Sequence, residues 1–244
     1  MGRLDDILDR GTLRRWERVL ARPDKMSSAD LAAVRNRARG LSERLDEVAR
    51  RAESCLVEAG PIPCPLHTDW AWRPALWCEG VETHALVCPK NGAALGPEAK
   101  IFHDCADGEV SVRQVPTTGR GVVPYAIAIE VYHFGGSFLS LSIDLPREAW
   151  SGLSRRHLIR VDAELEAERW IAPYVRLSVR HGPNVAQVVR QLEGDGFVDL
   201  DLGPTDLEDD RVTGAWVDRI FEAPAMTRVL VSDVTVSRRP RAAF

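Results

Sequence analysis

The stretch Ile159-Arg160-Val161-Asp162-Ala163-Glu164-Leu165-Glu166-Ala167-Glu168 alternates apolar and charged residues without a break. Successive side chains of a β-strand point to opposite faces, so this period of two predicts a strand with one buried and one solvated face. Segments 137–145, 175–180 and 198–202 alternate in the same way. Half-buried strands of this kind are typical of antiparallel sheets.

Shorter segments on both sides of these four also read as strands, separated by turns rich in glycine and proline. We predict strands at 84–88, 98–105, 109–115, 125–134, 186–192, 216–222 and 228–237. The last segment changes its apolar phase between Val231 and Val234, which indicates a β-bulge. No long helix alternates with the strands, which disfavours a doubly wound α/β fold. The predicted fold class is mainly β, an antiparallel, jelly-roll-like β-sandwich over residues 81–244.

Residues 1–60 have helical periodicity instead and are predicted to form a helical arm. Pro23 separates a first helix at about 4–20 from a second at about 28–58, and Ser27 with Asp30 resembles a capping box that starts the second. The second helix carries a coiled-coil seam in which apolar residues are spaced alternately by three and four. The seam comprises Leu31, Val34, Ala38, Leu41, Leu45, Val48, Ala52 and Cys55.

The two helices differ in length, at roughly 25 Å and roughly 46 Å for a rise of 1.5 Å per residue. Folded back as a hairpin, the first helix cannot cover the whole seam of the second. The rest of the seam packs either on the chain's own β domain or on another chain. We assign the residues Leu41, Leu45, Val48 and Ala52 to partner docking, in a larger assembly or a homo-oligomer.

Charge and composition limit the class of protein. The formal net charge of −4 and the pI of about 5.9 argue against nucleic-acid binding, which needs a basic face. The charge is +2 over residues 1–58 and −6 over the rest. No apolar run reaches the ~18 residues of a membrane span. An odd number of cysteines and an N-terminus without an apolar signal core predict a cytoplasmic protein without a disulfide scaffold.

Residues 61–80 form a linker rich in proline and tryptophan. Trp70, Trp72 and Trp77 lie beside Asp69 and Arg73. Aromatic rings on one face, flanked by a carboxylate and a guanidinium group, are one arrangement that binds a sugar. The same tryptophans could instead fix the linker on the sandwich, and the sequence leaves both interpretations open.

Cysteine and histidine residues gather between residues 64 and 105. His84, Cys88, His103 and Cys105 would form a tetrahedral zinc set if strands 84–88 and 98–105 were neighbours. Buried cysteine is also ordinary core material, and no paired C-x-x-C is present. His103, Asp104 and Cys105 are the centre of an enzymatic alternative. We assign no catalytic residue and no cofactor, because hydrolase, P-loop and dinucleotide-binding motifs are all absent.

Several motifs carry a family resemblance that extends over nearly the whole chain. They are Thr68-Asp69-Trp70-Ala71-Trp72-Arg73-Pro74, Phe102-His103-Asp104-Cys105, Gly136-Ser137-Phe138-Leu139-Ser140-Leu141, His181-Gly182-Pro183-Asn184, Trp216-Val217-Asp218, Phe221-Glu222-Ala223-Pro224, Asp233-Val234-Thr235-Val236 and Arg238-Arg239-Pro240-Arg241. With these motifs the chain resembles an uncharacterised alphaproteobacterial domain family of the Rhodobacter lineage. The resemblance implies no activity and no catalytic residue. The closing strands look more loosely like those of jelly-roll carbohydrate-binding modules.

These observations predict a non-catalytic binding or assembly module, an accessory subunit that docks to a partner through its N-terminal helices. The first alternative is a carbohydrate-binding β-sandwich that uses Trp70, Trp72 and Trp77. The second is an enzyme or zinc protein centred on His103, Asp104 and Cys105.

Overall fold

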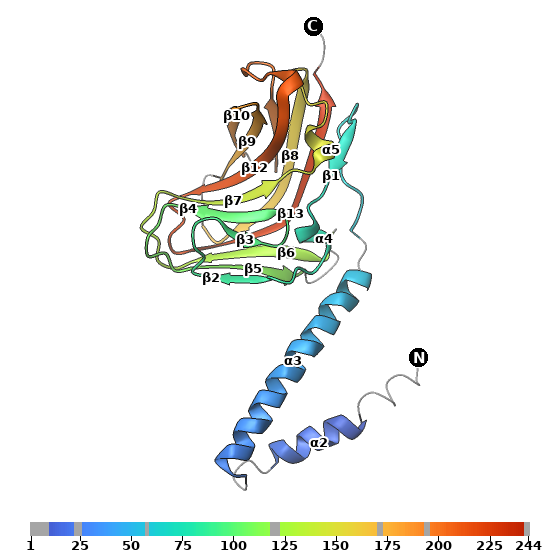
Figure 1. Cartoon of the computed structure of the whole chain (residues 1–244), viewed down its shortest axis with the longest axis vertical. Helices are drawn as coiled ribbons and strands as arrows, with labels where there is room; N and C mark the ends of the chain where they lie inside the picture. Colours follow the sequence, from blue (N-terminus) through green and yellow to red (C-terminus); the bar gives the residue numbers. More distant parts are fainter. Residues whose placement is uncertain are drawn as a thin grey trace. The chain divides into compact units, whose positions relative to one another are not determined.

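The computed structural model describes residues 10–21, 26–56, 59–117, 123–169, 173–192 and 196–241. The chain divides into two compact units, Met1–Arg51 and Ala52–Phe244 (Figure 1). Among the described residues, no helix is both long enough and apolar enough to cross a membrane.

The first unit contains α2 (Arg10–Leu20) and most of α3 (Ser28–Leu56). The predicted cap of α3 is confirmed, because the Asp30 backbone N–H donates to the Ser27 hydroxyl oxygen at 3.1 Å. The Ser27 hydroxyl in turn donates to the Asp30 carboxylate at 2.7 Å. An N-terminal pair of helices with one long member is therefore confirmed, while the predicted ends at residues 4 and 58 lie outside the described residues.

The second unit consists of two antiparallel sheets. The seven-stranded sheet contains β1 (Trp70–Trp72), β2 (Ala85–Val87), β5 (Val110–Pro116), β6 (Tyr125–Val131), β8 (His157–Ala167), β11 (Phe197–Asp201) and β13 (Thr227–Pro240). Its order is β11-β8-β13-β6-β5-β2, with β1 also paired to β13. The six-stranded sheet contains β3 (Ala93–Leu95), β4 (Ala99–His103), β7 (Phe138–Asp144), β9 (Pro173–His181), β10 (Asn184–Gln191) and β12 (Val212–Glu222). Its order is β10-β9-β12-β7-β4-β3.

The inward faces of the two sheets form one hydrophobic core, as alternation along the strands predicts. Leu141 and Ile143 of β7, Leu177 of β9 and Val161 of β8 are all fully buried. The predicted antiparallel β-sandwich is thus confirmed. The predicted bulge is also present, because the register between β13 and β8 shifts between Val231 and Asp233.

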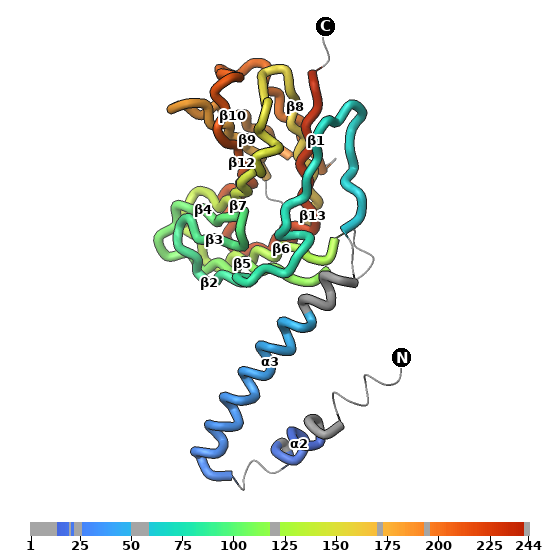
Figure 2. Tube along the Cα trace, turned by 45° about the vertical axis from the view of Figure 1, so that its right-hand side comes forward, coloured from blue at the N-terminus to red at the C-terminus, as the bar shows by residue number. Residues whose placement is uncertain are grey.

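The linker belongs to the sandwich, which alternation alone did not predict. β1 pairs with β13, with Trp70 opposite Arg238, and the two segments run side by side in Figure 2. The short helix α4 (Ala75–Cys78) follows it and buries Leu76 and Trp77. Two further short helical segments, α5 (Arg147–Trp150) and the 3₁₀ helix η2 (Asp209–Arg211), complete the described elements of this unit.

Candidate ligand-binding groove

The outer face of the six-stranded sheet carries a groove of about 390 Å³. Four adjacent strands, β9, β12, β7 and β4, supply its lining (Figure 1). Since Leu139, Leu141 and Ile143 of β7 fill the core, the alternate positions of that strand face outward into the groove. The lining residues are Lys100, Phe102, Phe138, Ser140, Ser142, Asp144, Arg176, Arg180, Trp216 and Asp218.

Strand register places a polar row across the floor of the groove. Lys100 lies opposite Ser142, Ser142 opposite Asp218, and Asp218 opposite Arg176. The Arg176 Nε donates to the Asp218 Oδ2 at 2.9 Å, and only 3% of the Asp218 side chain is exposed. At the rim the Lys100 ammonium pairs with the Asp144 carboxylate at 2.8 Å. Donors and acceptors are therefore held on rigid strands.

Aromatic side chains lie on both sides of this row. Phe102 of β4 lies opposite Ser140 of β7, and Trp216 of β12 lies opposite Asp144 of β7. All three aromatic lining residues, Phe102, Phe138 and Trp216, are partly exposed. The Arg180 guanidinium carbon lies 5.5 Å from the centre of a Trp216 ring. The groove thus combines apolar ring surface with charged and hydroxyl groups.

One hydroxyl on the floor has no partner. The Ser140 side chain is buried, and its Oγ makes no hydrogen bond among the residues that the structure describes. Buried polar groups are normally hydrogen-bonded, because an unpaired one costs about 1–3 kcal/mol. This hydroxyl therefore lies unpaired beneath the surface of the groove.

The three tryptophans of the linker lie in two different environments in the structure. Trp77 is fully buried, and its indole N–H donates to the Val231 carbonyl oxygen at 3.0 Å, so it presents no ring to a ligand at the surface. Trp70 and Trp72 stack on each other, with ring centres 6.4 Å apart, and pack partly buried against the core. A ligand at this pair stays a prediction.

The polar neighbours of these tryptophans are held in ion pairs. The Arg73 guanidinium makes two 3.0 Å bonds to the Asp233 carboxylate and a 2.7 Å bond to the Gly60 carbonyl oxygen. Asp69 accepts from the Arg238 Nε at 3.0 Å. These contacts fix the linker on β13. They match the interpretation in which the tryptophan cluster holds the linker on the sandwich.

The structure does not bring the proposed zinc ligands together on neighbouring strands. That premise was wrong, because β2, next to His84 and Cys88, pairs with β5, whereas β4, which ends at His103, pairs with β3 and β7. Cys105 is buried and its Sγ accepts from the Gly135 N–H at 3.3 Å. Across the described part of the chain, no three His, Cys, Asp or Glu side chains form a group suited to a metal.

Asp104, one of the three residues of the enzymatic alternative, organises a turn. Its carboxylate accepts from the backbone N–H groups of Ser137 and Phe138, at 2.8 and 3.2 Å, and from the Ser137 hydroxyl at 2.6 Å. These bonds lower the pKa of Asp104 below its usual value, and the bond from the Ser137 hydroxyl has the largest effect. A Cβ at Gly136 would lie 2.4 Å from the Asp104 Oδ1, so the close approach requires glycine.

The predicted docking residues of α3 fall into two groups. Leu41 lines a cleft together with Val34, another seam residue, and with Trp16 and Val19 of α2. Leu45 and Val48 are exposed, at 58% and 63%. The side chain of Ala52 lies outside the described residues.

Sequence reasoning missed the groove although it identified most of its strands. The available signal was that residues 100–102, 138–144 and 216–218 carry only aromatic, hydroxyl or charged side chains at their outward positions. Their adjacency depends on the strand order, which the sequence does not state.

Comparisons with known proteins match the chain to a family of unknown function (DUF6478) over residues 1–244. No curated protein matches the chain. The family-level resemblance is thereby confirmed, whereas the lineage stays a prediction.

Several solved structures are similar to part of the chain. A putative sugar binding protein from Bacteroides thetaiotaomicron has a TM-score of 0.41 and 15% identity, covering 66% of this chain and 96% of its own. The family 11 carbohydrate-binding module of a Clostridium thermocellum cellulase has a TM-score of 0.36 and 8% identity, covering 68% and 99%. The enzymatically active domain of a tailspike protein of bacteriophage CBA120 has a TM-score of 0.39 and 8% identity, covering 57% of this chain and 19% of the tailspike chain.

Proposed function

The chain belongs to this family of unknown function. We propose, from the groove, that the sandwich binds a carbohydrate on the outer face of its six-stranded sheet. The observation that carries this proposal is the polar row Lys100–Ser142–Asp218–Arg176 with aromatic side chains on both sides.

This combination suits the two kinds of surface that a sugar presents. The apolar C–H face of a sugar ring packs on an aromatic ring, and its hydroxyl groups exchange hydrogen bonds with polar side chains. Trp216 and Phe102 supply the rings, while the exposed groups of Lys100, Asp144 and Arg176 supply donors and acceptors. A rigid sheet lowers the entropy lost when the ligand binds, since the lining residues are already held in place.

A glycan array followed by calorimetry on the full chain tests this proposal. We expect the wild type to bind at least one glycan, and Trp216→Ala to weaken that binding about tenfold or more through loss of ring contact. Trp70→Ala is the matched control, because it removes a partly buried ring from the linker cluster on the other sheet.

Two outcomes would contradict carbohydrate binding in the groove. Silence of the wild type over the whole array would remove carbohydrate binding. Loss of binding in Trp70→Ala with unchanged binding in Trp216→Ala would transfer the site to the stacked pair Trp70 and Trp72.

We also propose a second function, assembly through the helical arm, with the α3 seam of a second copy as the partner. The observation in its favour is that Leu45 and Val48 are exposed, although they continue the seam whose earlier members line a cleft with α2. Apolar residues repeating every seven positions suit another helix with the same repeat, because both helices then keep one seam in contact.

Light scattering after size exclusion tests the arm separately from the groove. We expect the wild type to have a dimeric mass, and Leu45→Glu/Val48→Glu to reduce it to that of a monomer. Asn36→Glu/Arg39→Glu, which introduces two negative side chains away from the seam, should leave the mass unchanged. A monomeric wild type at high protein concentration would contradict self-association.

A further inference from the structure

The charges that line the groove do not balance. Lys100, Arg176 and Arg180 contribute three positive charges, and Asp144 and Asp218 contribute two negative ones. Lys100 pairs with Asp144, and Arg176 pairs with Asp218. No carboxylate among the described residues pairs with Arg180. The Arg180 guanidinium is therefore the one lining cation without a carboxylate partner among the described residues.

Arg180 is held at the groove by an aromatic ring instead of an acid. Its guanidinium carbon lies 5.5 Å from the centre of a Trp216 ring, and the residue is exposed. A cation–π contact orients a guanidinium group but leaves its charge and its N–H donors uncompensated. The planar fork of these donors matches the two oxygens of a carboxylate or of a sulfate.

The floor of the groove adds a second free donor set. Arg176 lies four residues before Arg180 on the same face of β9. Its contact with Asp218 uses Nε, and its two terminal nitrogens have no hydrogen-bond partner among the described residues. At about 3.3 Å per residue the two arginine positions are about 13 Å apart along the strand. Successive units of an acidic sugar chain could meet one cation after the other.

We propose that the ligand of this groove is an acidic glycan, whose anionic group binds the guanidinium of Arg180 beside Trp216. This inference rests on the proposed carbohydrate function and specifies its ligand class. Trp216 and Phe102 contact sugar rings, and Arg180 binds the carboxylate or sulfate.

The test measures binding of the full chain to three polymers: polygalacturonate, which carries carboxylates, dextran sulfate, which carries sulfates, and neutral dextran. We expect an acidic polymer to bind and neutral dextran to bind at least about tenfold more weakly, because a charge-assisted hydrogen bond is lost. The preferred acidic polymer distinguishes a carboxylate from a sulfate.

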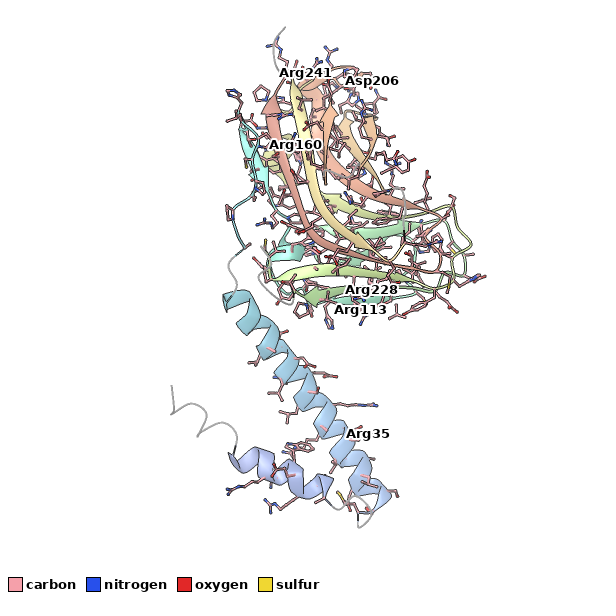
Figure 3. The ribbon with its side chains drawn as sticks, turned by 180° about the vertical axis from the view of Figure 1, so that it is seen from behind. Arg35, Arg113, Arg160, Asp206, Arg228 and Arg241 are labelled. Atoms are coloured by element: carbon pink, nitrogen blue, oxygen red, sulfur yellow. The ribbon has the colours of Figure 1, made fainter. Side chains whose placement is uncertain are left out.

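Variants connect the preference to Arg180. Arg180→Gln should reduce the affinity for the acidic polymer about tenfold or more and lessen the salt dependence of binding. Arg180→Lys should restore only part of the affinity, because lysine lacks the planar set of guanidinium donors. Arg113→Gln is the matched control, since it removes an arginine from the other sheet (labelled in Figure 3). Arg113 pairs there with Glu130 at 2.9 Å. An equal loss in both glutamine variants would indicate unspecific attraction and overturn the inference.

Failure of this inference is distinguishable from failure of carbohydrate binding. If neutral glycans bind, depend on Trp216 and ignore Arg180→Gln, the acidic ligand is wrong and the groove function stands. If neither acidic polymer binds the wild type, the inference also falls. If no glycan on the array binds at all, both proposals fall.

Discussion

Arg219 lies on the inward face of β12, between the core residues Val217 and Phe221. Its side chain is fully buried, and none of its three guanidinium nitrogens has a hydrogen-bond partner among the described residues. Burial lowers the pKa of Arg219 to about 10, because the low-dielectric interior disfavours its charged form. A buried cation without a partner is a cost to the fold.

Replacing this cation by an apolar side chain of similar length should stabilise the protein. We expect Arg219→Met to raise the free energy of unfolding by roughly 1–4 kcal/mol, the range found when buried ion pairs are replaced by apolar residues. Urea unfolding at neutral pH measures the change. Arg219→Lys, which keeps a charge at the same site, should give no gain, and a loss of stability in Arg219→Met would indicate a partner for the guanidinium.

Asp199 on β11 shows the opposite situation, a carboxylate with two cationic partners. Arg160 bonds it through two nitrogens at 2.9 Å each, and Arg239 bonds it at 2.8 Å. The hydrogen bonds from Arg160 are the main reason that the pKa of Asp199 is lowered. A lowered carboxyl pKa means that its stabilisation is present above the unfolded value of about 3.9 and is lost as pH falls through the folded pKa.

We therefore expect Asp199→Asn to lower the free energy of unfolding by about 1 kcal/mol at pH 7 and by less at pH 3. Urea midpoints at both pH values measure the difference from the wild type. Asp206→Asn is the control, because Asp206 is exposed and its side chain makes no hydrogen bond or ion pair with another described residue (Figure 3). A difference for Asp199→Asn that does not change with pH would contradict the ion-pair explanation.

At the scale of elements, Gln114 connects β5 to the region of α4. Its side-chain nitrogen donates to the carbonyl oxygens of Leu76 and Glu79 at 2.7 Å each, and its oxygen accepts from the Val81 N–H at 3.0 Å. One buried amide thus satisfies three backbone groups of a segment that has little regular structure of its own. The position of α4, and hence of Trp77, depends on it.

Gln114→Leu should destabilise the protein by at least about 2 kcal/mol, since three backbone groups lose their partner and each unsatisfied group costs about 1–3 kcal/mol. Hydrogen exchange should increase first in residues 75–82. Arg113→Leu is the neighbouring control, because 45% of that side chain is exposed and its effect should stay within about 0.5 kcal/mol. Equal losses in the two variants would contradict the role of Gln114.

At the scale of the whole molecule, we expect the sandwich to fold without the arm. All described strands and the buried core lie between residues 70 and 240, within the second compact unit. A fragment of residues 59–244, which keeps Gly60 for its bond from Arg73, should unfold cooperatively with a Tm within a few degrees of the full chain. Thermal unfolding followed by near-ultraviolet circular dichroism measures this, and a fragment that binds hydrophobic dye and unfolds without a transition would contradict it.

The sequence by itself determined which part of this chain is helical and which part forms strands, because the causes of both are local. Alternation in 159–168 predicts a half-buried strand, observed as β8, and the pair Ser27 and Asp30 predicts the start of α3. The phase change before Val234 also predicted the bulge in β13. Each of these depends on side chains only a few positions apart.

Only the tertiary structure decided which outward faces form a groove. Lys100, Ser142, Asp218 and Arg176 come from four strands far apart in the sequence, and they align because of strand order and register. The same cause explains the failure of the zinc set, whose strands lie in different sheets, and the burial of Trp77. Alternation determines which face a residue occupies, but pairing between distant strands decides its neighbours across the sheet.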